Sequence, residues 1–419
     1  MSPAIASLLA LLVAIVVSMV ARLNVGLLAI AMAWGVGTGL GGLKTDAVLS
    51  GFPGSLFVTL IGVTTLFAIA ETNGALERVA NRAVRIVRGD ARWLPIIFFL
   101  LATGISSIGP GAIATVALLA PVGLAVGVRA GVSPLVMALL VGNGANAGNL
   151  SPVSAIGVIA NAKMAEGGLG GHEGKVFFAN AAAHALVALG AYLLFGGWRT
   201  PVATSSAEPT ASIGAVAPIT RDQQLTLIVV GLWLLCVVGF KLPPGPSALT
   251  AALVLLVARA ADEARVIRTL PWAVLLMVCG VSVLVNVLDK TGGMTLFTGL
   301  LASIATANTV DGAIAFVTGA ISSWSSTSGV VLPAFLPTVT SLAQQVGGGD
   351  PLAIALSINV GSALVDVSPL STLGALCVAA ISDPVVSRQL FRQLLIWGLS
   401  MTVVGALLCQ LFAGVIARA

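Results

Sequence analysis

Long apolar runs, separated by short polar connections, follow one another along the whole chain. A membrane-spanning helix needs about 20 predominantly apolar residues. Runs that meet this requirement lie near 4–21, 25–42, 55–71, 133–160, 176–196, 223–240, 246–259, 271–288, 352–380 and 393–416. The pattern therefore predicts an all-α polytopic membrane protein with about ten full spans.

Two further apolar stretches, 94–127 and 312–345, contain a polar break rich in Gly and Ser. Irregular backbone at membrane depth is tolerated only where protein or a water-filled cavity satisfies its polar groups. We therefore predict that each stretch is a re-entrant helical hairpin, which enters and leaves the membrane from one face.

Composition excludes a soluble protein. Hydrophobic residues make up 58% of the chain and charged residues 8%, whereas soluble domains carry about 25% charged residues. The formal net charge is +5, but the cations are scattered over short loops. They indicate membrane topology rather than a nucleic-acid partner, and we expect the lipid bilayer to surround most of the chain.

The distribution of Lys and Arg orients the predicted spans. Three loops hold clusters of arginine: Arg78, Arg82, Arg85, Arg88 and Arg92; Arg259, Arg265 and Arg268; Arg388 and Arg392. All three fall on the same side when both hairpins are re-entrant, and the positive-inside rule makes that side cytoplasmic. Both termini are then predicted to lie outside.

An internal repeat connects the two halves of the chain. Ser106-Ser107 matches Ser322-Ser323 at an offset of 216, and Ser151-Pro152 matches Ser368-Pro369 at 217. The first repeat (about 50–160) begins with an inward span and the second (about 271–380) with an outward one. We predict inverted repeats in halves 1–199 and 222–419, joined by a cytoplasmic linker at 200–221.

Each repeat also contains a predicted helix break. The breaks lie at Gly142–Asn149 and at Asn359–Asp366. Inverted repeats with broken helices are typical of secondary transporters whose substrate binds near the bilayer midplane. The chain has no nucleotide-binding motif, so we expect no cofactor and a coupling ion, Na⁺ or H⁺, as the source of energy.

The hairpin tips and breaks supply the candidate substrate-binding residues. Free N–H groups at a helix start favour an anion, and hydroxyl and amide groups add donors. The candidates are Ser106, Ser107, Gly109, Gly111, Asn143, Asn146, Ser325, Ser326, Thr327, Ser328, Asn359 and Ser362. Two facing half-sites would suit a small molecule with two anionic ends, although a zwitterion or a monovalent anion is also compatible.

Oxygen atoms at the breaks suit a hard cation such as Na⁺. The coupling-ion candidates are Asn143, Asn149, Ser151, Asn359, Asp366 and Ser368. Asp366 is the most specific, because a charge near the bilayer centre costs about 2.5–3.5 kcal/mol. We interpret it as a cation ligand or proton carrier; the alternative is a structural acid. Glu71, Asp289 and Lys290 are interpreted as helix-end groups.

The stretches SSIGPGAIATVALLAPV and GNGANAGNLSPVSAIGVI, within 106–159, resemble the MatC-type dicarboxylate carriers of bacteria, which transport malonate or C4-dicarboxylates. The overall plan also looks, more distantly, like the divalent anion/sodium symporters of the ion transporter superfamily. These resemblances imply a multi-pass protein of the bacterial inner membrane, a homodimer, a fixed scaffold, and a transport domain that carries both hairpins in an elevator-type motion.

One departure from the symporters bears on coupling. They carry Ser-Asn-Thr at each hairpin tip, where this chain has Gly111-Ala112-Ile113 and Thr327-Ser328-Gly329. Proton coupling through Asp366 therefore rivals sodium coupling. The leading hypothesis is a secondary carrier for a small carboxylate. A cation/proton antiporter on the same plan is the second, and a channel or membrane enzyme is the third. No nucleophile–base or metal constellation supports an enzyme.

Overall fold

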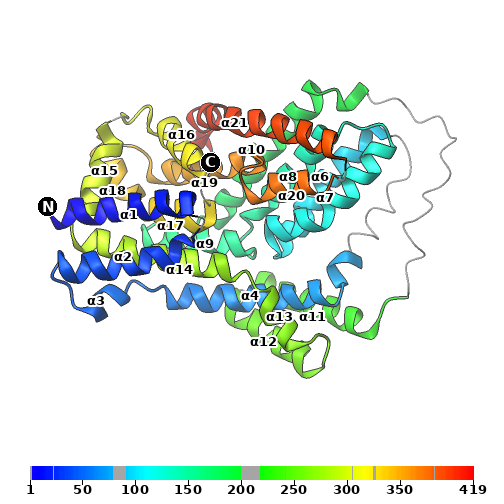
Figure 1. Cartoon of the computed structure of the whole chain (residues 1–419), viewed down its shortest axis with the longest axis horizontal. Coiled ribbons are helices and arrows are strands. Elements are labelled where there is room, and N and C mark those ends of the chain that lie inside the picture. The colour runs from blue at the N-terminus through cyan, green and yellow to red at the C-terminus, as the bar shows by residue number, and fades with distance from the viewer. Residues whose placement is uncertain are drawn as a thin grey trace.

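The computed structural model describes residues 2–21, 23–78, 91–199, 218–240, 242–303, 305–323, 327–381 and 383–419. Every regular element in these ranges is a helix, which confirms the predicted all-α class (Figure 1). The linker predicted at 200–221 falls almost entirely outside the described residues, as do Ser325 and Ser326.

The helices of the first half run from the N-terminus to residue 199. They are α1 (Pro3–Ala21), α2 (Val25–Gly39), α3 (Thr45–Leu49), α4 (Gly54–Thr72), the short 3₁₀ helix η1 (Ala91–Trp93), α6 (Leu94–Ile108), α7 (Gly111–Arg129), α8 (Pro134–Asn149), α9 (Ala155–Glu166), α10 (Glu173–Leu194) and η2 (Gly197–Arg199).

The helices of the second half follow residue 220. Its helices are α11 (Arg221–Phe240), α12 (Pro244–Val257), α13 (Glu263–Thr269), α14 (Trp272–Lys290), α15 (Gly293–Ser303), α16 (Val310–Ser322), the π-helix η3 (Thr327–Val331), α17 (Leu332–Phe335), η4 (Leu336–Thr338), α18 (Val339–Gln345), α19 (Pro351–Leu364), η5 (Val365–Val367), α20 (Thr372–Ala379) and α21 (Pro384–Arg418).

The helices are those of a multi-pass membrane protein. Among the described residues, 7 helices are long and apolar enough to cross a bilayer, or up to 8 if the bent pair α16 and η3–α18 is one span. Three more apolar helices are shorter: residues Pro3–Val17 of α1, and the whole of α2 and α12. The chain is therefore polytopic, as predicted, and the count of about ten full spans stays a prediction.

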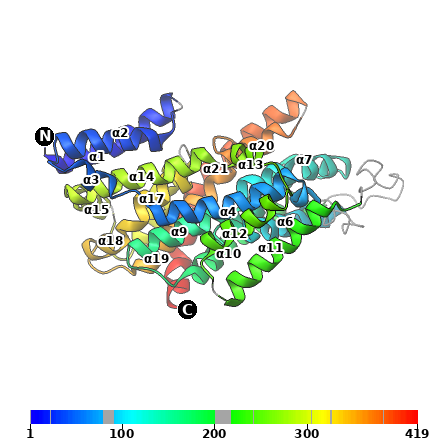
Figure 2. The ribbon, with the colours of Figure 1, turned by 90° about the horizontal axis from the view of Figure 1, so that it is seen from below.

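The helices of the two predicted hairpins extend to opposite ends of the molecule, away from their tips. α6 and α7 are joined by Gly109 and Pro110, and the turn requires positive φ at Gly109 (+151°) and Gly111 (+75°), which glycine tolerates. The second pair, α16 and η3–α18, is bent by 119°. Along the longest axis, α6 and α7 occupy one end, whereas α15, α16 and α18 occupy the other (Figures 1 and 2).

The first helix break differs from the prediction. Residues Gly142–Asn149 are not a break, because α8 continues to Asn149 and the chain leaves the helix only at Leu150–Ser154. Similarly, α19 continues to Leu364, and the irregular turn after η5 is at 368–371. The glycines serve packing instead: a Cβ on Gly144 would lie 2.4 Å from the Phe99 carbonyl oxygen of α6.

The same close contacts occur in both halves. Gly144 packs against Phe99 in α6, and Gly361 packs against Ala315 in α16. Ser154 and Ser371 each donate a hydrogen bond to the carbonyl three residues earlier. These paired positions are separated by the offset of about 217 found in the sequence.

The correspondence of contacts extends beyond the predicted repeats to α2 and α12. A Cβ on Gly62 of α4 would lie 2.1 Å from the Gly245 carbonyl oxygen of α12, and a Cβ on Gly280 of α14 would lie 2.1 Å from the Gly26 carbonyl oxygen of α2. Small residues let membrane helices approach closely enough to gain packing and polar contacts.

This packing gives a stability prediction. Gly62→Ala and Gly280→Ala should each destabilise the protein by about 1–3 kcal/mol, because the added methyl group forces two backbones apart. Thermal unfolding in detergent would measure the loss. Gly35→Ala in α2 is the control, since nothing lies within 4 Å of its Cβ position. Equal melting temperatures for all three variants would contradict the close approach.

Candidate substrate site

A cavity of about 550 Å³ lies where the tips of the two hairpins meet the end of α8 and the second break. The first tip contributes Gly109–Ala114, and the second contributes Thr327 and Ser328. Asn146 and Asn149 reach the cavity from the end of α8, whereas Asp366 and 370–373 reach it from the second break. Segments separated by more than 200 residues in the sequence therefore share one cavity.

The first tip and the first break are joined by an amide. The backbone N–H of Ala112, at the start of α7, donates a hydrogen bond to Asn149 Oδ1 at 3.0 Å. Asn146, one turn earlier in α8, donates from Nδ2 to the Ala363 carbonyl oxygen of α19 at 3.1 Å. Both side chains thus fix the cavity wall across element boundaries, and both are buried.

The second tip and the second break are joined by a hydroxyl. Thr327 Oγ1 lies 2.8 Å from Asp366 Oδ1 and 3.2 Å from the Ser362 carbonyl oxygen. The Ser322 hydroxyl also contacts Thr327 Oγ1. Asp366 is consequently held against the tip of the second hairpin, in the way that Asn149 is held against the tip of the first.

Asn149 and Asp366 occupy corresponding positions. They are 217 residues apart, the offset that also separates Ser151 from Ser368. The backbone carbonyl of each residue accepts a hydrogen bond from a serine five residues later, Ser154 for Asn149 and Ser371 for Asp366. The two half-sites therefore share their geometry and differ in charge, with a neutral amide in one and a carboxyl group in the other.

Some predicted site residues lie outside the cavity wall. Ser107 donates to the Thr103 carbonyl at 2.7 Å, and Ser362 donates to the Ile358 carbonyl at 2.6 Å. Asn359 contacts the Ala355 carbonyl and the Met164 sulfur. The predicted residues that are described but do not line the cavity are Ser106, Ser107, Asn143, Ser151, Asn359, Ser362 and Ser368.

Helix α10 supports the first half-site from behind. Asn180 Nδ2 donates to the Asn146 carbonyl oxygen at 2.6 Å. One turn later, His184 Nδ1 lies 2.9 Å from Asn143 Oδ1. All four side chains are buried. The sequence alone could not assign Asn180 to the site, because a single Asn in an apolar helix often only makes a contact between two helices.

Glu71 and Ser371 are cavity residues that the sequence analysis did not assign to the site. Glu71 lies in the last turn of α4, as expected of a helix-end group, and it also lines the cavity. Ser371 could have been found from Ser154 by the constant offset.

The charge of the cavity is one-sided. Glu71 and Asp366 are both acidic, and none of the described lining residues is Lys, Arg or His. The described residues also contain no group of three His, Cys, Asp or Glu side chains that could hold a metal ion. Among the described lining residues, the groups that can donate a hydrogen bond to an anion are backbone N–H groups, hydroxyls and side-chain amides.

A comparison with known families gives a match to about the first third of the chain. Residues 1–149 match the family model of the dicarboxylate carrier protein MatC N-terminus. The predicted resemblance to MatC-type carriers is thereby confirmed over this stretch. No curated protein matches the chain. The matched region contains α1–α8, and so it includes the first hairpin tip and the cavity residues Asn146 and Asn149.

Proposed function

We propose that this protein is a secondary active transporter of a small dicarboxylate, such as malonate or succinate, which binds in the cavity between the two hairpin tips. One observation carries the proposal: both tips, the end of α8 and the second break line a single cavity, in a chain that matches a dicarboxylate carrier family over residues 1–149. A cavity of about 550 Å³ has ample room for such a molecule.

Each tip receives one end of the substrate. At the first tip, α7 begins at Gly111, which lines the cavity, and the positive end of its dipole would attract a carboxylate, although the Ala112 N–H is held by Asn149. At the second tip, Ser328 lines the cavity and its hydroxyl would bind a carboxylate, whereas the Thr327 hydroxyl is engaged by Asp366 and the Ser362 carbonyl. Two donor-rich ends separated by a small cavity favour a molecule with two anionic ends over a monovalent anion.

Transport is coupled to a cation through Asp366. A dianion beside the carboxyl groups of Glu71 and Asp366 is repelled unless Na⁺ or H⁺ binds as well. Bound at Asp366, the cation lies against Thr327 of the second tip, which places it beside the substrate. Binding of one then favours binding of the other, and this reciprocity is the basis of symport.

The corresponding contacts in the two halves support alternating access. If the halves are inverted repeats, exchanging their arrangements converts a cavity open on one side into a cavity open on the other. The transport domain would consist of the hairpins, α8–α10 and α19–α21. It would move as an elevator against a scaffold of α1–α4 and α11–α14 in a homodimer.

A second candidate is a cation/proton antiporter on the same scaffold. The acidic lining of the cavity favours it, because the carboxyl groups of Glu71 and Asp366 attract cations. A site for cations alone needs no anion-binding tip.

Uptake by proteoliposomes separates the two proposals. Labelled malonate and succinate are offered under an imposed Na⁺ or H⁺ gradient, with unlabelled dicarboxylates as competitors. Symport predicts uptake that depends on one gradient and is inhibited by the competitors. The absence of uptake under either gradient, together with cation-dependent pH changes in the lumen, would replace the carrier with the antiporter.

A further inference from the structure

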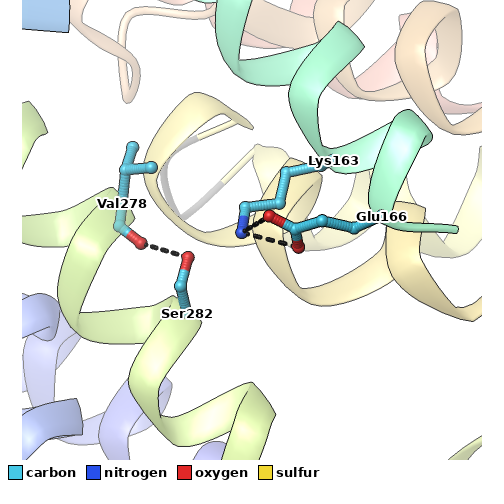
Figure 3. Close-up of polar contacts among 4 residues, drawn as sticks. All are labelled: Lys163, Glu166, Val278 and Ser282. Carbon is cyan, nitrogen blue, oxygen red and sulfur yellow. Dashed lines mark hydrogen bonds and ion pairs between the residues drawn. The ribbon is translucent and has the colours of Figure 1, made fainter. Parts of the chain in front are cut away.

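A buried lysine lies outside the cavity, in helix α9. Lys163 is only 2% exposed, and its Nζ donates to both carboxylate oxygens of Glu166 at 2.8 Å (Figure 3). A charged side chain within a membrane protein is costly and is usually functional. The Glu166 side chain, by contrast, is 48% exposed. The lysine is therefore buried deeply while its partner remains free to be hydrated.

Lys163 lies on the side of the second hairpin. Helix α9 begins at Ala155, which lines the cavity, and reaches Lys163 after eight residues, or about 12 Å along the helix axis. Just beyond it, the Gly167 carbonyl accepts a hydrogen bond from Thr340 of α18 at 2.6 Å. Lys163 is thus separated from the cavity and adjoins the opposite end of the molecule.

The ammonium group of Lys163 points toward helix α14. Figure 3 shows Lys163 and Ser282 directed toward one another from α9 and α14. The Ser282 hydroxyl donates to the Val278 carbonyl at 2.7 Å, and Ser282 is 5% exposed. Helices α9 and α14 both pack against η3 and α17 of the second hairpin, and Lys163 and Ser282 are buried in this structure.

The corresponding region in the other half is part of the cavity wall. Thr64 of α4, the counterpart of Ser282 in α14, lines the cavity together with 370–373 at the start of α20. Helix α20 is the counterpart of α9. The buried region between α9 and α14 is therefore the counterpart of the cavity wall between α20 and α4, and we call it the second, closed entrance. The offset of 217 pairs Lys163 with Ala380, so only the closed entrance has a lysine at this position.

We propose that Lys163 is a carboxylate-binding residue of the second entrance, between α9 and α14. When this entrance opens, Lys163 exchanges the Glu166 carboxylate for a carboxylate of the substrate. When it closes, Glu166 neutralises the lysine again, so that no unpaired cation is buried. This inference rests on the proposed dicarboxylate transport, and it makes the two faces of the carrier unequal in their recognition of anions.

Sided transport kinetics test this role. Lys163→Met should raise the half-saturating concentration of succinate on the order of tenfold at the face of the second entrance, because a charge-assisted hydrogen bond is lost. The value at the other face should stay within about twofold. Lys163→Arg keeps the charge and should restore most of the affinity. Lys175→Met is the control, since Lys175 donates to the Ala417 carbonyl of α21, away from this entrance.

Thiol labelling gives an independent readout. In a variant whose native cysteines are replaced by alanine, Ser282→Cys should react with a membrane-impermeant thiol reagent only from the face of the second entrance, and Thr64→Cys only from the other. Wild-type uptake with unchanged half-saturating concentrations in Lys163→Met would overturn the role of Lys163 alone. Wild-type protein that takes up no dicarboxylate would instead overturn the proposed function.

Discussion

Asp366→Asn is expected to abolish gradient-driven uptake, with a loss on the order of 100-fold. The carboxyl group of Asp366 contacts Thr327 at the second tip and is one of two acidic groups in the cavity wall. The substitution removes the carboxylate that would pair with the proposed coupling cation. Loss of one partner of a buried charge pair costs about 2–5 kcal/mol, and each 1.4 kcal/mol is about tenfold in affinity. Uptake of labelled succinate under Na⁺ and H⁺ gradients would measure the loss.

A matched control keeps the chemistry of the substitution and changes its place. Asp262 is the N-cap residue of α13 and accepts a hydrogen bond from the Arg265 N–H at 2.8 Å. Asn caps a helix as well as Asp does, so Asp262→Asn should transport like the wild type. Wild-type dependence on both gradients in Asp366→Asn would exclude Asp366 from coupling and return it to the alternative interpretation, a structural acid.

The charge difference between the half-sites explains why one residue should have so large an effect. Asn149 and Asp366 have corresponding positions, and each accepts a hydrogen bond from its own hairpin tip. Substituting Asn at 366 makes the two half-sites alike and leaves no carboxyl group between the tips. Among the described lining residues, Glu71 at the end of α4 would then be the one acidic group left to attract a cation.

The sequence located the cavity through repetition rather than through any single motif. Serines and prolines at a constant offset marked the tips and the breaks, and the structure brings Gly109, Gly111, Asn146, Thr327 and Asp366 to one cavity. This was predictable because polar backbone in an apolar run has few allowed surroundings.

Glycine in the same runs could not be interpreted from sequence alone. Gly142 and Gly144 were predicted to break α8, yet the helix continues through them because neighbouring helices approach so closely. A Cβ on Gly142 would lie 2.8 Å from a methyl carbon of Val367, in the second half. Glycine weakens a helix and also permits close packing, and only the tertiary contact decides between the two.

Glu71 and Asn180 show the other limit of sequence. Glu71 ends an apolar run and was interpreted as a helix-end group; whether such a group also lines a cavity depends on α14 and α20, which are distant in the sequence. Asn180 acts through the backbone carbonyl of Asn146. Any residue can supply a backbone carbonyl, so the sequence pattern could not have paired Asn180 with Asn146.

Gly111→Val is expected to remove substrate binding at the first tip. Gly111 has φ of +75°, a conformation that β-branched residues rarely adopt. Its Cβ would lie 3.4 Å from Asn149 Oδ1, so the methyl groups of valine would crowd the hydrogen bond between Asn149 and Ala112. Strain of about 1–3 kcal/mol corresponds to a rise in the half-saturating concentration of roughly 5- to 150-fold.

Two further variants separate strain at the tip from bulk in the helix. Gly111→Ala keeps most of the backbone strain without the larger side chain, and it should give an intermediate half-saturating concentration. Gly104→Val changes a glycine of α6 that has nothing within 4 Å of its Cβ position, and it should bind like the wild type. Unaltered succinate affinity in folded Gly111→Val would show that the first tip does not touch the substrate. The anion would then depend on Thr327 and Ser328 alone, which would favour a monovalent substrate over a dicarboxylate.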